Sequence, residues 1–170
     1  MPNWCANNLM VTGELSELER FRDAITTEQG GIEILSRLVP VPASSSAAEY
    51  WGSKWGDCDT GSDGPDALGF SLWFSSAWAP PVEGIRKVSN LFSSLLFVLE
   101  FEEPGMDFCG ALAARAGICE VVDTSISEGL GPVADTDDYD AQNEIVNDLK
   151  ALAVAEALAL LEETENEVTA

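Results

Sequence analysis

The sequence of 170 residues contains no histidine. Histidine is the side chain that exchanges protons most readily near neutral pH, and it is the commonest metal ligand in proteins. Its absence excludes Ser-His and Cys-His nucleophile pairs as well as histidine-bound metal centres. Only carboxylate chemistry, thiol chemistry and non-catalytic roles remain. We therefore expect a binding protein with no enzymatic activity, no cofactor and no metal.

Positive charge is also scarce, because eight Lys and Arg residues face 30 Asp and Glu residues and the net charge is −22. Such a surface repels nucleic acid and anionic membranes, and it attracts basic proteins. We therefore expect neither direct nucleic-acid binding nor membrane association, and we expect a basic protein or nucleoprotein complex as the partner. Apolar residues make up 46% of the chain, which is enough for a folded core.

The negative charge is unevenly distributed along the chain. Residues 1–119 contain 16 acidic and seven basic residues, whereas residues 120–170 contain 14 acidic residues and one base, Lys150. This asymmetry marks the last third as a separate surface. Three interpretations of the acidity are open: it provides solubility, it adapts the protein to high salt, or it imitates the phosphates of a nucleic acid.

Long apolar runs and paired cysteines are missing as well. The first residues form neither a basic region nor an apolar stretch, so no signal peptide is expected, and no apolar run reaches the length of a membrane span. The four cysteines are widely spaced, with no CxxC pair. Reduced thiols in a cytoplasmic protein are the expectation. These cysteines are Cys5, Cys58, Cys109 and Cys119.

The aspartates of residues 57–66 are a candidate cation site that the spacing rejects. In a calcium loop beginning at Asp57, Leu68 would occupy position 12, where a bidentate Glu is required. In a loop beginning at Asp59, that position falls on Phe70. A solvated acidic loop is the better interpretation.

Hydrophobic periodicity predicts an α+β fold, with a layer of helices on one face of an antiparallel sheet. Residues 43–49 and 57–66 are expected to be loops, because they are rich in small residues, Gly and Asp. Strands are predicted at residues 3–12, 67–76, 95–102, 108–115 and 118–123, helices at 14–29 and 82–92, and a short helical piece at 32–39.

The chain is expected to divide into a domain at residues 1–123, a linker at 124–136 and an acidic helix with a frayed tail at 137–170. The helix should begin near Ala141, with fraying from Glu162 onward. Its apolar stripe either docks on the sheet of its own domain or pairs with another copy or another protein. The predicted stripe contains Ile145, Val146, Leu149, Leu152, Ala153, Ala155, Leu158, Leu160 and Leu161.

Five short segments carry a resemblance to a known family. They are Met-Pro-Asn-Trp-Cys-Ala-Asn at 1–7, Val-Thr-Gly at 11–13, Trp-Gly-Ser-Lys-Trp at 51–55, Ser-Ala-Trp-Ala-Pro-Pro at 76–81 and Gly-Met-Asp-Phe-Cys-Gly at 105–110. Their order and separation resemble the YubB ferredoxin-like family, also called Api92-like, over residues 1–120. Ser53 and Ala79 depart from the pattern, which has Thr and Ser there.

The resemblance implies a ferredoxin-like topology of strands and helices, without an iron–sulfur cluster. It also implies an origin in a mobile element such as a phage or plasmid, and no settled activity. Combined with the charge, it favours an inhibitor that imitates nucleic acid and occupies a basic groove of a host defence complex, of the anti-CRISPR or anti-restriction type. The candidate partner-binding residues are Asp135, Asp137, Asp138, Asp140, Glu144 and Asp148.

Two alternatives remain open. The first is a small-ligand or peptide-binding module lined by tryptophan, in which the acidity only solubilises the protein. Its candidate residues are Trp51, Lys54, Trp55 and Trp78. The second is a carboxylate or thiol enzyme, which requires a deep pocket into which Asp, Glu or Cys side chains converge.

Overall fold

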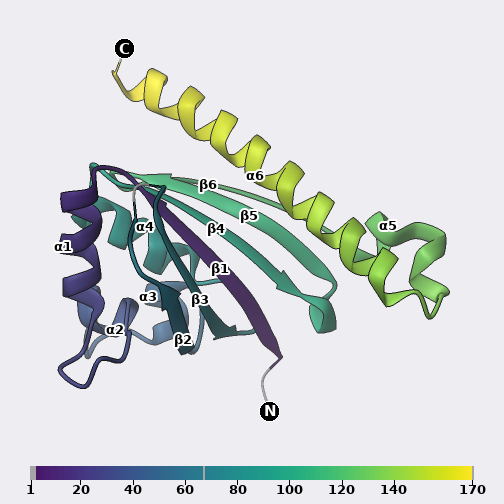
Figure 1. Ribbon diagram of the computed structural model, residues 1–170, viewed down its shortest axis with the longest axis horizontal. Helices are drawn as coiled ribbons and strands as arrows, with labels where there is room; N and C mark the ends of the chain where they lie inside the picture. Colours follow the sequence, from purple (N-terminus) through teal and green to yellow (C-terminus); the bar gives the residue numbers. More distant parts are fainter. Residues whose placement is uncertain (1–2, 67, 170) are drawn as a thin grey trace.

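The computed structural model describes residues 3–66 and 68–169, so Met1, Pro2, Ala67 and Ala170 of the predicted segments lie outside it. Six antiparallel strands form one sheet in the order β2-β3-β1-β4-β5-β6 (Figure 1). The strands are β1 (Trp4–Thr12), β2 (Cys58–Asp63), β3 (Phe70–Ala77), β4 (Leu96–Glu103), β5 (Phe108–Arg115) and β6 (Ile118–Thr124).

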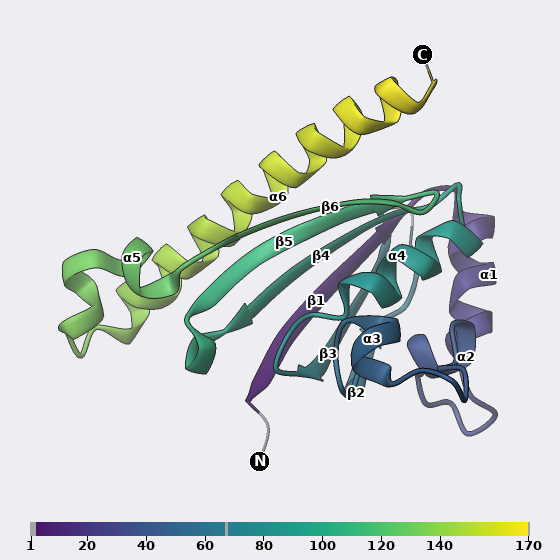
Figure 2. The same cartoon turned by 180° about the vertical axis from the view of Figure 1, so that it is seen from behind.

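Helices cover both faces of the sheet. The first four lie on one face, and the last helix crosses the other face diagonally (Figures 1 and 2). We call these the inner and the outer face. The α-helices are α1 (Leu15–Ile25), α2 (Leu35–Leu38), α3 (Ala47–Trp51), α4 (Val82–Leu91), α5 (Ile126–Leu130) and α6 (Tyr139–Thr169), and 3₁₀ turns occupy η1 (Pro104–Met106) and η2 (Gly131–Asp135). The α+β, ferredoxin-like prediction with an added C-terminal helix is confirmed.

The main core lies between the inner face and helices α1 to α4. Phe21, on the predicted apolar side of α1, is fully buried at its centre. Its ring meets Phe92 and Phe97 edge to face, at centroid distances of 5.2 and 5.5 Å. Strand β1 alternates strictly between buried and exposed residues, as a strand covered on one face should.

Residues 57–66 are not the predicted loop, because Cys58–Asp63 forms the edge strand β2. An edge strand carries little apolar signal, and β2 also contains a bulge between Cys58 and Gly61. At Gly61 a Cβ atom would come within 2.5 Å of the Trp73 ring, so glycine makes room for that indole. The predicted loop at 43–49 likewise contains the start of α3, which Ser46 begins with a capping box to Glu49.

Helix α6 docks on the outer face over β5 and β6. Ala153, Ala157 and Leu161 are buried in this contact, where Ala157 packs with Ala113. The helix starts two residues before the predicted Ala141 and stays regular through the segment expected to fray. Leu152 and Ala155 of the predicted stripe are exposed instead, because at 100° per residue they lie opposite the buried set.

The expected linker at 124–136 is largely ordered as α5 and η2. Asp107 attaches α5 to the turn after β4, because its carboxylate accepts hydrogen bonds from the Ser125 hydroxyl at 2.7 Å and from the Ser127 amide at 2.8 Å. Across residues 3–66 and 68–169, none of the helices has the length and apolarity that crossing a membrane requires.

Candidate functional site

The predicted acidic surface lies at one end of α6 and in the turn that precedes it. All six predicted side chains are exposed. Asp140, Glu144 and Asp148 follow one another at four-residue intervals and so share one side of the helix. Asp138 also begins the helix, because its carboxylate accepts the Ala141 amide at 3.1 Å. Asp135 closes η2, and Asp137 lies between the two.

Few of the carboxylates of α6 are paired with a base. The one cation on this helix, Lys150, forms an ion pair with Glu102 of β4 at 2.6 Å. Glu165 contacts Arg115 at 3.3 Å, and in the described parts of the chain no other acid of α6 forms an ion pair. Five of the eight bases lie on α1, α2 and α4 instead: Arg20, Arg22, Arg37, Arg86 and Lys87. The bases therefore lie mainly on helices of the inner face, and among the described residues α6 is left with seven acids outside any ion pair.

The spacing of the acids along α6 is sparser than the spacing of phosphates. Residues four apart are separated by about 6 Å along a helix. A DNA strand carries a charge about every 3.4 Å of its axis. The row formed by Asp140, Glu144 and Asp148 thus has roughly half the linear charge density of one strand. The aspartates of the turn before α6 extend this row of charges, but they do not shorten the spacing between its members.

The predicted aromatic set is divided by the fold. Lys54 and Trp55 do lie together, with the Lys54 ammonium 5.1 Å from the Trp55 ring centroid. Trp51 is separate, because its indole donates to the Val39 carbonyl at 2.7 Å and packs against the core. Trp78 remains 43% exposed at a backbone φ of 73°.

The partner of Trp55 is Trp4, which is not in the predicted ligand-binding set of Trp51, Lys54, Trp55 and Trp78. Their ring centroids are 5.9 Å apart, and both rings are more than two-fifths exposed. No spacing pattern relates residues so distant in the chain. The pairing of Trp4 with Trp55 becomes apparent only in the folded protein, where β1 lies beside the loop that precedes β2.

Polar side chains join the short segments in which the sequence resembles the YubB ferredoxin-like family. The Asn7 side-chain amide donates to the Cys5 carbonyl at 2.9 Å and to the Ser76 hydroxyl at 2.9 Å. The Ser53 hydroxyl contacts the carbonyls of Trp55 and Ala77, both at 2.9 Å. Each of these side chains is buried, so their role is to build the fold rather than to contact a ligand.

The cysteine thiols are poorly suited to nucleophilic chemistry. Burial raises the pKa of Cys5 and that of Cys119 to about 12, and it also raises the pKa of Cys58 and Cys109. At neutral pH these groups are thiols, whereas the thiolate is the nucleophile. Within the described residues there is also no group of three Cys, Asp or Glu side chains that is placed to hold a metal.

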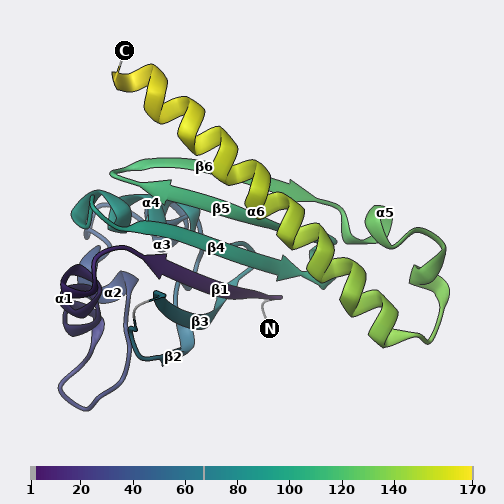
Figure 3. The same ribbon diagram turned by 45° about the horizontal axis from the view of Figure 1, so that its top comes forward.

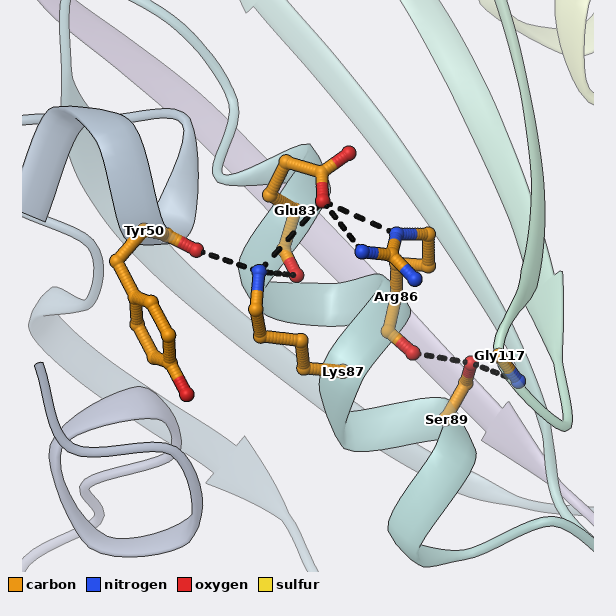
Figure 4. A network of polar contacts seen from close by, with 6 residues as sticks. All are labelled: Tyr50, Glu83, Arg86, Lys87, Ser89 and Gly117. Carbon is orange, nitrogen blue, oxygen red and sulfur yellow. Dashed lines mark hydrogen bonds and ion pairs between the residues drawn. The ribbon is translucent and has the colours of Figure 1, made fainter.

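A cleft of about 670 Å³ was not predicted from the sequence. It lies between α2, α4 and the turn joining β5 to β6, and Arg86, Lys87 and Tyr50 are among its lining residues. Figure 4 shows that Glu83 lies between the two cations, 2.7 Å from Arg86 and 3.5 Å from Lys87. The pKa of Glu83 is lowered, chiefly by its hydrogen bond from Arg86.

The cations of this cleft are thus engaged within the protein. Lys87 also donates to the Tyr50 carbonyl at 2.8 Å and lies 4.5 Å from the centroid of the Tyr50 ring. Nearby, the Ser89 hydroxyl accepts the Gly117 amide at 3.1 Å, which fastens the β5–β6 turn to α4 (Figure 4). The network braces helices against the sheet and leaves little free positive charge for an anion.

Comparison with known proteins supports the fold and the family. A crystal structure of a protein api92 from Yersinia pseudotuberculosis is similar at a TM-score of 0.56 and 9% identity, covering 69% of this chain and 95% of that one. No curated protein matches the chain. The family model for the ferredoxin-like domain in Api92-like protein matches residues 51–147, which is more than half of the sequence. The chain therefore belongs to the family of Api92-like proteins with a ferredoxin-like domain.

Proposed function

We propose that the protein is a non-catalytic inhibitor that binds a basic surface of a partner through the carboxylates of α6 and of the turn before it. That surface is one that otherwise holds nucleic acid, in a host defence complex of the anti-CRISPR or anti-restriction type. In this proposal, the protein is encoded by a mobile element and acts in the cytoplasm of the host cell. Its partner is a basic protein or nucleoprotein, not free nucleic acid.

The observation that carries this proposal is the separation of charge. The carboxylates at Asp140, Glu144 and Asp148 face solvent without an ion pair, while most bases lie on helices of the opposite face. Acidity that served only solubility would have no reason to separate the two signs. Unpaired carboxylates on a rigid helix lose no internal contacts when they meet a cationic groove, and they speed association through long-range attraction.

The lining of one cleft and the protonated state of the thiols support the proposed lack of catalytic activity. The cleft of about 670 Å³ is lined by Arg86, Lys87, Asn90 and mainly apolar groups, and none of its lining residues is Asp, Glu or Cys. The cysteine thiols stay protonated at neutral pH because burial raises their pKa values. This cleft therefore offers neither a nucleophile nor a pair of carboxylates facing each other.

A second candidate function is favoured by the pair formed by Trp4 and Trp55. These two half-exposed rings, with Lys54 beside one of them, offer a platform for a flat or anionic small ligand. In that case the acidity of α6 has no part in binding. Trp55→Ala would abolish binding, while neutralising the acids of α6 would leave it unchanged.

The experiment compares two variants of equal net charge. One replaces Asp135, Asp137, Asp138, Asp140, Glu144 and Asp148 by Asn or Gln. The control replaces six exposed acids elsewhere: Glu14, Glu19, Glu28, Glu33, Asp59 and Asp63. DNA binding by purified restriction and CRISPR effector complexes is followed by fluorescence anisotropy while each variant is added. We expect the control to inhibit like the unchanged protein, with inhibition weakening as salt rises, and the first variant to lose inhibition.

A further inference from the structure

The outermost strand β6 has a regular edge whose only charged side chains are acidic. Natural sheets protect an edge strand with a proline, a charged side chain, a bulge or a covering helix. The seven residues of β6 include neither proline nor lysine, and all seven pair with β5 without a register shift. The opposite edge, β2, does contain a bulge. The two edges of the same sheet therefore differ in their readiness to accept another strand.

The hairpin geometry identifies the free backbone groups of β6. Ala116 and Gly117 form a two-residue turn, and both have positive φ, at 52° and 83°. The residues flanking such a turn, Arg115 and Ile118, form a hydrogen-bonded pair, and hydrogen-bonded pairs then alternate along the ladder. The N–H and C=O groups of Cys119, Val121 and Asp123 consequently point away from β5. Within the described chain, these groups have no hydrogen-bond partner outside the ladder.

Two clefts flank this edge, one on each face of the sheet. On the inner face, a cleft of about 290 Å³ is lined mainly by apolar side chains, including Val82, Phe101 and Phe108, and it reaches Val121 and Asp123 of β6. On the outer face, a cleft of about 280 Å³ lies between β6 and α6. Leu149, Leu152 and Glu156 supply the helix side of the outer cleft. Figure 3 shows α6 crossing β6 so that its C-terminal end extends beyond the sheet.

We propose that β6 binds an extended segment of another protein, which adds as a seventh strand and alternates apolar with basic residues. Successive side chains of a strand point to opposite faces, so an added strand would fill both clefts in turn. Apolar side chains fit the inner cleft beside Phe101 and Phe108. Basic side chains fit the outer side, where Glu156 lines the cleft and no lysine or arginine does.

The charge of this edge disfavours a second copy of the chain as the occupant. Pairing two β6 strands would bring Glu120 and Asp123 close to the same residues of the other copy, on chains that each carry −22. Like charges opposed across strands are destabilising. A basic segment meets the same carboxylates favourably. This inference does not depend on the inhibitor proposal, because it uses a different surface.

Hydrogen exchange measured by NMR tests the inference with defined peptides. The probe is a capped Lys-Val-Lys-Val-Lys-Val-Lys peptide, and the control peptide has the same residues in two blocks, Lys-Lys-Lys-Lys-Val-Val-Val. We expect the alternating peptide alone to slow exchange at the amides of Cys119, Val121 and Asp123 by tenfold or more. Glu120 and Val122 should change little, because their amides already donate to β5.

Variants at the edge give a second readout. Val121→Pro removes an outward N–H without breaking the ladder, and Val121→Lys keeps the N–H but adds a charge that discourages strand addition. Both should abolish the protection at Cys119 and Asp123, whereas Ser62→Lys on β2 should not. The inference is overturned if neither peptide protects these amides, if both peptides protect them equally, or if Val121→Pro and Val121→Lys leave protection intact. Protection that rises with protein concentration alone also overturns it, because the occupant is then a second copy.

Neutralising the six acids from Asp135 to Asp148, which leaves Glu156 of the outer cleft in place, separates the two proposals. A lysine-rich peptide that only associates with the helix carboxylates loses binding in that variant and gives no protection at the edge. Edge protection that survives this neutralisation supports strand addition even where inhibition of DNA binding fails. Edge protection that disappears together with the helix acids overturns the strand inference.

Discussion

The ammonium of Lys150 lies 2.6 Å from the carboxylate of Glu102, which joins the only base of α6 to the outer face of β4. The lysine side chain is 16% exposed and the glutamate side chain 32% exposed, so both are partly withdrawn from water. Almost all other charges on the helix are negative. This ion pair fixes the helix on a sheet face that also carries negative charge.

Replacing Lys150 by Met should therefore destabilise the protein. Glu102 would keep its charge in a half-buried position beside an acidic helix, and we expect a loss of about 1 kcal/mol in the free energy of unfolding. Urea denaturation measures it. Glu102→Gln in the Lys150→Met background should recover part of the lost stability, since it removes the carboxylate charge that has no partner. Strictly additive effects of the two substitutions would show that the pair is not coupled.

The contact between Ala157 and Ala113 limits how large a side chain can be under α6. Ala157 is fully buried, so Ala157→Leu should force the helix away from the sheet and cost about 1–3 kcal/mol. Ala155→Leu on the exposed side is the matched control, with an expected change within about 0.5 kcal/mol. Thermal or urea unfolding distinguishes them. Equal effects would mean that α6 does not dock on the sheet.

The cysteines should react slowly in the folded protein. Because burial raises the pKa of Cys5 and Cys119 to about 12, almost no thiolate is present at pH 8. Iodoacetamide labelling followed by mass spectrometry should modify these two sites much more slowly in the native state than in urea. Rapid native labelling of Cys5 would contradict its burial and would reopen a thiol enzyme as a hypothesis.

The attachment of α5 should depend on pH through Asp107. Its pKa is lowered from the usual 3.8, first by the hydrogen bond from the Ser125 hydroxyl and then by the Ser127 amide and hydroxyl. A lowered folded-state pKa contributes stability above 3.8 that is lost as the pH falls through the folded value. The Ser127 amide should therefore lose its protection from hydrogen exchange below this pH. In Asp107→Asn that pH dependence should disappear.

Much of the fold could be predicted from local patterns, because its strands and helices carry clear periodicity. Leu18, Phe21 and Ile25 predicted the buried side of α1 correctly. β2 was missed because an edge strand with a bulge and a glycine under the Trp73 ring has no apolar alternation. In α6, apolar residues occur on nearly all sides, so the sequence could not show that Leu152 faces away from the sheet.

The candidate site could be predicted only in part. The excess of acids in the last third of the chain located the acids of α6, because such an excess can be read from the sequence without knowing any tertiary contact. It could not show that Lys150 is engaged by Glu102, or that Trp4 rather than Trp51 accompanies Trp55. The edge of β6 was not recognised either, because a free edge depends on the order of strands in the sheet, which one strand sequence does not reveal.

The anisotropy titration with the two variants of equal net charge tests the inhibitor proposal most directly. Both have lost six carboxylates, so they differ only in where the remaining charge lies. We expect the loss of the six acids from Asp135 to Asp148 to abolish inhibition of DNA binding, while the loss of six acids elsewhere does not. Equal inhibition by both variants, or failure of the unchanged protein to displace DNA from any complex, would contradict it.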